Sequence, residues 1–168
     1  MTDARRLLVV VRHSKTEAYA TTDHARTLTD RGKRDARELG RWLDRADVTP
    51  EVLLVSSAAR AQQTAELAGA ELGSEPEIVV VDELYGASPD EVIEICRAQL
   101  DDSVERAALV GHNPTMAGVV DLLIGSDTDE DLGHFPTSAT AVIEIAGRWD
   151  SLGEGAGTLV SLYRPKNH

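Results

Sequence analysis

Cysteine, aromatic side chains and long apolar runs are all scarce in this chain of 168 residues. Its single cysteine, Cys96, has no partner for an internal disulfide, so a fold held together by disulfides is excluded. No apolar run reaches the roughly 20 residues that a membrane-spanning helix requires, so we expect no membrane partner. The first residues also lack the long apolar stretch of a signal peptide, and we therefore expect a cytoplasmic protein.

Positive charge is scarce as well, because 17 lysine and arginine residues face 29 aspartate and glutamate residues, for a net charge of -12. Such a chain has no general basic surface for a nucleic-acid backbone, so we expect no nucleic-acid partner. An acidic protein that binds phosphate must gather its few cations in one place. The spacings typical of metal sites, Cys-x-x-Cys and His-x-x-x-His, do not occur, so we expect no metal and no other cofactor.

The sequence does contain a regular alternation of apolar strand-like runs with helix-like patterns. Continuous apolar runs predict buried strands, whereas alternating runs predict strands toward an edge of a sheet. The predicted strands are Leu7–Val11, Val52–Val55, Ile78–Val81, Ala107–Val110 and, with more alternation, Thr140–Ile145 and Thr158–Tyr163. This order predicts an α/β fold, with one domain over residues 1–168 in three α/β/α layers around a mostly parallel sheet.

Capping signals mark the helices between these strands. The predicted helices are Asp30–Asp44 after Thr29, Ala58–Leu72 before Gly73, a helix from the capping box Ser88-Pro89-Asp90-Glu91 to Leu100, and one from Asn113-Pro114 to Ile124 before Gly125. The acidic stretch Gly125–Thr137 lacks periodicity and is expected to be a solvated loop. Gly153–Gly157 is expected to be the turn of a terminal hairpin.

Polar side chains follow the first four predicted strands directly. Parallel strands place their carboxyl ends at one edge of the sheet, where ligands bind in open α/β folds. The four segments are Arg12-His13-Ser14-Lys15, Ser56-Ser57-Ala58-Ala59-Arg60, Asp82-Glu83-Leu84-Tyr85 and Val110-Gly111-His112-Asn113-Pro114. Guanidinium groups bind phosphate oxygens and an imidazole attacks phosphorus, so this convergence favours phosphoryl chemistry.

In this order the motifs resemble the histidine phosphatase superfamily, and most closely its short SixA-like phosphohistidine phosphatase branch. The matching motifs, over roughly residues 7–145, are Arg12-His13, Arg26-Thr27-Leu28-Thr29 with Gly32, Ser57 with Arg60 and Thr64, Glu83, and Gly111-His112. The resemblance implies a phosphoglycerate mutase-like fold and a phosphatase. The chain departs from the family triplet Arg-His-Gly at Ser14, where a serine either crowds the site or adds a hydroxyl donor.

The resemblance also implies a role for each matching residue. His13 is expected to attack phosphorus and form a covalent phosphohistidine. Arg12, Arg60 and His112 are expected to stabilise the phosphoryl oxygens, in place of a metal ion. Glu83 is expected to protonate the leaving group. The expected phosphate-binding residues are Arg12, His13, Arg60, His112, Arg26, Ser57 and Lys15.

Three functions remain open from the sequence. Little chain is left for a lid between Val81 and Ala107, so the favoured function is a phosphatase that accepts a phosphohistidine on another protein. The first alternative is a small-molecule phosphomonoesterase or phosphoglycerate mutase-like enzyme. The second is a non-catalytic phosphate-binding or interaction module. The other histidines, His24, His134 and His168, are expected to be ordinary surface residues.

Overall fold

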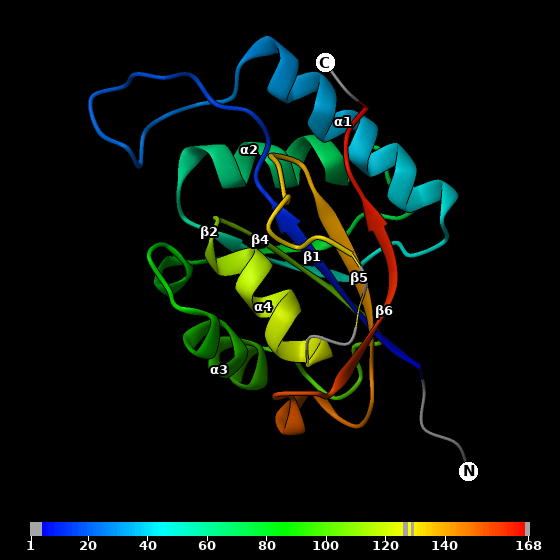
Figure 1. Ribbon diagram of the computed structural model, residues 1–168. Helices are drawn as coiled ribbons and strands as arrows, with labels where there is room; N and C mark the ends of the chain where they lie inside the picture. The colour runs from blue at the N-terminus through cyan, green and yellow to red at the C-terminus, as the bar shows by residue number, and fades with distance from the viewer. Residues whose placement is uncertain (1–4, 126–127, 129, 167–168) are drawn as a thin grey trace.

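The computed structural model describes residues 5–125, 128 and 130–166, and it has one six-stranded sheet between two pairs of helices (Figure 1). The strands are β1 (Arg6–Arg12), β2 (Val52–Ser56), β3 (Glu77–Val81), β4 (Arg106–Gly111), β5 (Thr140–Ile145) and β6 (Gly157–Tyr163). The helices are α1 (Asp30–Arg45), α2 (Ala59–Gly69), α3 (Pro89–Gln99) and α4 (Thr115–Ile124), with the short 3₁₀ helices η1 (Asp82–Leu84) and η2 (Trp149–Ser151). Every predicted strand and helix is present.

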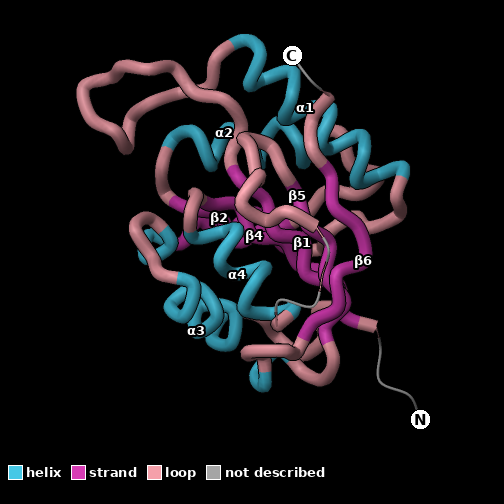
Figure 2. Tube along the Cα trace, in the orientation of Figure 1, coloured by secondary structure: helices cyan, strands magenta, loops and turns pink. Residues whose placement is uncertain are grey.

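Four strands of the sheet run parallel and end at one edge. The strand order is β3-β2-β4-β1-β5-β6, in which the first four strands pair in parallel, β5 is antiparallel to β1, and β6 is antiparallel to β5 (Figure 2). The register aligns the strand ends, with Arg12 opposite Gly111 and Val81 opposite Ser56. The segments that follow these four strands therefore emerge at the same edge, as predicted.

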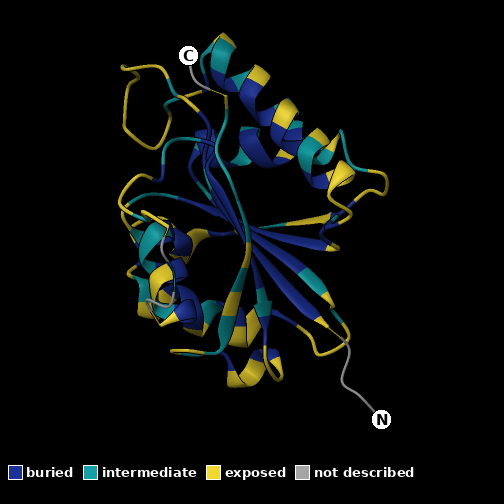
Figure 3. Ribbon diagram, turned by 45° about the vertical axis from the view of Figure 1, so that its right-hand side comes forward, coloured by how far each residue is buried: buried dark blue, intermediate teal, exposed yellow. Residues whose placement is uncertain are grey.

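Alternate residues along the strands enter two separate cores. In β1, Leu8 and Val10 pack in the core that α3 and α4 cover, whereas Val9 and Val11 pack in the core under α1 and α2. Strands β1, β2, β4 and β5 are buried on both faces, as their dark blue colour in Figure 3 shows, whereas β3 and β6 at the two edges are partly exposed. The three-layer α/β/α arrangement is thereby confirmed. No helix among the described residues is long and apolar enough to cross a membrane.

The loop after β1 is tied to the beginning of α1. The backbone N–H of Thr29, the N-cap residue of α1, donates to the carbonyl oxygen of Lys15 over 3.0 Å. A Cβ atom at Gly32 would lie 2.1 Å from the same oxygen, so only glycine lets the helix approach this closely. The first turn of α1 therefore fixes the backbone two residues beyond His13.

The predicted helix boundaries differ most from the structure at the end of α2 and at the beginning of α4. Helix α2 ends at Gly69 instead of Leu72, because the N–H groups of Glu71 and Leu72 bond carbonyls three residues back and tighten the chain into turns. The predicted C-cap, Gly73, instead donates its N–H to the Asp44 carboxylate. The helix predicted from Asn113-Pro114 begins at Thr115, although the Asn113 side chain still accepts the Ala117 N–H.

The stretch Gly125–Thr137 is only partly a solvated loop. Residues 126, 127 and 129 lie outside the described part of the chain, as does His168. Phe135 is buried, and its carbonyl oxygen accepts hydrogen bonds from the Arg12 guanidinium and the Asn113 side chain. The second half of the stretch therefore packs against the end of β1, a long-range contact that has no signature in local sequence.

Candidate active site

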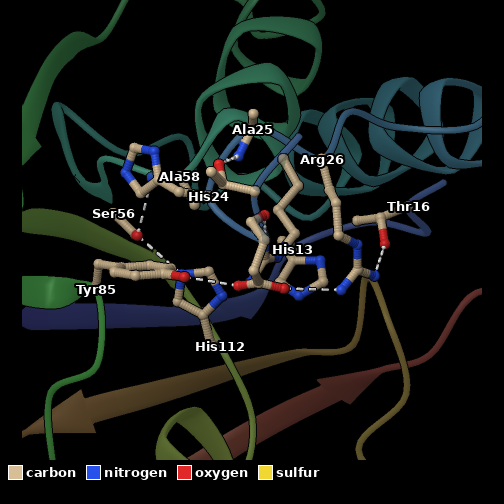
Figure 4. A network of polar contacts seen from close by, with 12 residues as sticks. His13, Thr16, His24, Ala25, Arg26, Ser56, Ala58, Tyr85 and His112 are labelled. Carbon is tan, nitrogen blue, oxygen red and sulfur yellow. Dashed lines mark hydrogen bonds and ion pairs between the residues drawn. The ribbon is translucent and has the colours of Figure 1, made fainter. Parts of the chain in front are cut away.

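The two histidines that follow β1 and β4 lie side by side. Because these strands are neighbours in the sheet, the ring centroids of His13 and His112 are 5.2 Å apart, with their planes tilted by 55° (Figure 4). Arg12 precedes His13 on β1, and Arg60 enters from the first turn of α2. Both guanidinium groups are close enough to lower the pKa of each imidazole. The predicted convergence of two histidines and two arginines is present.

His13 is buried in an orientation that exposes one nitrogen to a reacting group. Its Nδ1 lies 2.8 Å from the carbonyl oxygen of Ser14, and because a carbonyl only accepts, Nδ1 carries the proton. Nε2 then keeps its lone pair, and no protein group in the described part of the chain bonds it. Burial, more than the neighbouring His112 and Arg60, lowers the His13 pKa to about 3. The imidazole is therefore unprotonated at neutral pH and able to act as a nucleophile.

His112 is held by the end of β2. Its Nε2 lies 2.8 Å from the Ser56 hydroxyl, which also accepts the N–H of Ala58. Burial and then the charge of Arg60 lower the His112 pKa to about 4. This ring is neutral in the unliganded site, and a bound anion would favour its protonated form.

The two arginines differ in how many of their guanidinium nitrogens already donate hydrogen bonds to protein atoms. Arg12 donates from Nη1 to the Phe135 carbonyl over 3.2 Å, and its Nη2 has no protein partner among the described residues. Burial lowers the Arg12 pKa from its ordinary value. Arg60 is buried, and both of its terminal nitrogens bond Asp23, one the backbone carbonyl at 2.8 Å and one the carboxylate at 3.0 Å.

Asp23 joins the loop between β1 and α1 to the site. Its carboxylate accepts hydrogen bonds from Arg60, from the Tyr85 hydroxyl at 2.6 Å and from Arg26 at 2.9 Å. The Tyr85 and Arg60 hydrogen bonds hold the Asp23 pKa well below its usual range, so the carboxylate is ionised. The remaining guanidinium nitrogens of Arg26 bond Glu17 and Thr16. Arg26 thus anchors the loop, and its predicted contact with phosphate stays a prediction.

Ser14, which replaces the family glycine, is fixed at every polar atom. Its N–H donates to the Thr64 hydroxyl over 2.9 Å, and its carbonyl accepts from His13. Its hydroxyl lies 2.5 Å from that of Ser138, and both serines are fully buried. The side chain therefore points toward the segment before β5. The serine does not crowd the site, and it adds an anchor behind His13.

Three predicted site residues do not join this cluster. Glu83 is exposed in η1 and lines a pocket of about 320 Å³ with α3 residues such as Glu91. Neither Glu83 nor the Lys15 side chain contacts His13 or His112 through a hydrogen bond or ion pair in the described structure. Ser57 lies at the rim and bonds His24 instead. Consecutive residues of a tight turn point in different directions, which explains why Glu83 faces α3 although Tyr85 reaches the histidines.

Sequence reasoning missed Asp23, His24 and Tyr85. His24 is exposed, as predicted for a surface residue, and its ring also lies 4.9 Å from the Tyr85 ring, measured between centroids. Tyr85 belongs to the segment after the third predicted strand, in which the motifs pointed to Glu83 instead. Asp23 and His24 come shortly before Arg26, so the sole available signal was proximity in sequence to a matching motif.

The gathered charges suit an anion. Among the described residues, no three His, Cys, Asp or Glu side chains are grouped so as to hold a metal ion. Arginine pairs recognise phosphate oxygens well, because each guanidinium offers several donors in a planar fork. A neutral imidazole with a free lone pair beside two guanidinium groups is an arrangement for transferring a phosphoryl group.

Comparisons with known proteins agree with this chemistry. Residues 8–86 match the model of the histidine phosphatase superfamily (branch 1). An uncharacterised protein of Mycobacterium leprae is 36% identical over 149 residues, which are 86% of this chain and 89% of that protein. A proposed phosphohistidine phosphatase SixA from Nakamurella multipartitia has a TM-score of 0.84 and 29% identity over 97% of this chain and 98% of its own. The protein histidine phosphatase SixA complexed with tungstate has a TM-score of 0.80 and 28% identity, over 95% of this chain and 97% of its own.

Proposed function

The chain belongs to branch 1 of the histidine phosphatase superfamily and is a phosphatase, and we propose that it acts without a metal through a phosphohistidine formed on His13. The observation that carries the proposal is the hydrogen bond from His13 Nδ1 to the Ser14 carbonyl. It fixes the tautomer, so the lone pair on Nε2 is available beside two arginines. The role of metal ions in other phosphoryl transfers, charge neutralisation, falls to these cations.

The proposed reaction has two steps. In the first, the Nε2 lone pair of His13 forms a bond to phosphorus while the bond between phosphorus and the leaving group breaks. In the second, water attacks phosphorus, the bond to Nε2 breaks, and inorganic phosphate leaves with His13 again neutral. Arg12, Arg60 and His112 would bind the three non-bridging oxygens, where negative charge gathers in the transition state.

The proposed substrate is a protein that carries a phosphohistidine, in the cytoplasm. Support comes from the two SixA structures, of which one is described as a protein histidine phosphatase and binds tungstate, an oxyanion of the same tetrahedral shape as phosphate. The missing contact between Glu83 and the histidines adds support. The imidazole nitrogen of a phosphohistidine is easily expelled, so this substrate needs no strong acid at the leaving group.

The test is release of inorganic phosphate from a histidine-phosphorylated carrier protein in the presence of EDTA. We expect release by the wild type and none by His13→Ala, whereas His134→Ala, an exposed histidine elsewhere, keeps full activity. Strict dependence on Mg²⁺ would contradict the metal-independent mechanism. Release from small phosphate esters alone would favour the phosphomonoesterase or mutase-like alternative, and phosphate binding without turnover would favour a binding module.

A further inference from the structure

Four aromatic rings form a continuous row from the buried nucleophile to the surface. The centroid distances along the row are 5.2 Å from His13 to His112, 5.5 Å from His112 to Tyr85, and 4.9 Å from Tyr85 to His24. His13 is 7% exposed, whereas Tyr85 is 38% exposed and His24 is also exposed. Figure 4 shows Tyr85 next to His112 and His24 beyond it. The proposed catalytic steps use only the rings of His13 and His112.

A leaving group in this site would project toward solvent, where the row of rings also ends. Phosphoryl transfer places the attacking and leaving atoms roughly in line with phosphorus. Because the attacking His13 is buried, the leaving group must project toward solvent. Tyr85 and His24 are the exposed members of the row, and Tyr85 borders His112.

Both outer rings are held in place by hydrogen bonds. The Tyr85 hydroxyl donates to the ionised Asp23 carboxylate over 2.6 Å, and Asp23 is itself bound by the buried Arg60. His24 Nε2 lies 2.9 Å from the Ser57 hydroxyl. The two rings stand nearly perpendicular to each other, at 83°. Rings already fixed lose little conformational freedom when a ligand packs against them.

We propose that Tyr85 and His24 form a leaving-group subsite that takes a planar aromatic ring, here the imidazole of a phosphohistidine. The proposal rests on the phosphatase function proposed above and names the feature by which the site selects its substrate. A ring in this subsite gains aromatic contacts that an alkyl or ammonia leaving group lacks. The Asp23 carboxylate beside the subsite is ionised, so it cannot protonate a leaving group. The two rings therefore select a leaving group by its shape.

The test compares two small substrates that differ in the leaving group, phosphoimidazole with an aromatic ring and phosphoramidate with none. The readout is the ratio of their kcat/KM values. We expect Tyr85→Leu to lower this ratio between about 2-fold and 12-fold, the range for one aromatic contact. Tyr85→Phe, which keeps the ring and loses the hydroxyl, should keep the ratio, and His24→Ala should lower it. Tyr19→Leu is the matched control, because that tyrosine is 92% exposed in the loop between β1 and α1, which also carries His24.

Other outcomes would overturn the subsite. If Tyr85→Leu lowers kcat/KM equally for both substrates, the ratio is unchanged and Tyr85 acts only by holding Asp23. If Tyr85→Phe lowers the ratio as much as Tyr85→Leu does, the hydroxyl and not the ring is responsible. The affinities of both compounds for His13→Ala, measured by calorimetry, give the same comparison without turnover. If the wild type hydrolyses neither compound, the proposed function is judged on the histidine-phosphorylated carrier protein, and the binding ratio in Tyr85→Leu on the His13→Ala background decides the subsite.

Discussion

At the scale of single residues, the site depends on two imidazoles kept unprotonated by their surroundings. Burial is the main cause in both, and the neighbouring guanidinium groups act in the same direction. A histidine in water would be partly protonated near neutral pH and so partly unable to attack phosphorus. Burial therefore keeps His13 in the form that the proposed attack on phosphorus requires.

The lowered pKa of His13 predicts a flat acid side in the pH profile of kcat/KM. With its pKa at about 3, His13 stays almost fully unprotonated at pH 5, whereas an ordinary histidine would be only about 3% unprotonated there. We expect phosphoramidate hydrolysis, corrected for ionisation of the substrate, to change less than about 2-fold between pH 7 and pH 5. A tenfold fall with an inflection near pH 6.5 would show that a histidine essential for turnover titrates normally.

The Ser14 hydroxyl predicts a coupled contribution to stability. Ser14→Gly removes its bond to Ser138 and leaves that buried hydroxyl unpaired, so the free energy of unfolding should fall by about 1–3 kcal/mol. Ser138 has a φ of 67°, where glycine is favoured, so Ser138→Gly should cost less. In urea unfolding the double variant should lose less than the sum of the single losses. Strict additivity would mean that the two hydroxyls do not interact.

At the scale of secondary-structure elements, the short helix η1 decides which residue of its segment faces the histidines. The chain turns through Asp82–Leu84 directly after β3. Glu83 faces α3, Leu84 is buried in the core, and Tyr85 reaches His112. One turn thus directs three consecutive side chains to three different surroundings.

This arrangement predicts that Glu83→Gln has little effect on turnover. Loss of a true general acid lowers the rate by about 10²–10⁴-fold, whereas an exposed residue on the α3 side should change kcat less than about 2-fold. The measurement is kcat for phosphoramidate and for an ester with a poor leaving group. A large loss confined to the ester would reinstate Glu83 as the proton donor.

At the scale of the whole molecule, an acidic protein carries a local cationic site. The net charge is -12, yet Arg12, Arg26 and Arg60 converge around the ends of β1 and β2, and Asp23 is the one carboxylate in the described part of the chain that binds any of them. A bound phosphoryl dianion would offset this local excess of positive charge. Binding to the folded state alone stabilises a protein in proportion to the logarithm of ligand concentration.

Inorganic phosphate is therefore expected to raise the free energy of unfolding, by about 2.7 kcal/mol at a concentration 100 times its Kd. The measurement is urea unfolding with phosphate or with chloride at equal ionic strength. Arg60→Ala should abolish the increment, whatever its own stability. Arg34→Ala should keep it, because Arg34 is exposed and has no ion pair among the described residues. The same increment in both variants would place the phosphate elsewhere.

The sequence by itself determined the layers of the fold and the cluster of candidate catalytic residues. Continuous apolar runs identified the central parallel strands, because strands covered on both faces bury all their side chains, and more alternating runs identified the last two strands. Their parallel order brought Arg12, His13, Arg60 and His112 to one edge, since parallel strands end together. These residues lie at strand ends or in the first turn of a helix, so local pattern was enough to find them.

Only the tertiary structure decided the rim of the site. Whether Glu83 or Tyr85 faces the histidines depends on the direction of one turn, and the place of Asp23 and His24 depends on how a long loop folds back over α2. Likewise, the Ser14 hydroxyl finds its partner 124 residues away in Ser138. Such contacts join segments that are distant in sequence, and their geometry is set by packing of the whole molecule, which leaves no periodic or compositional signal in the chain.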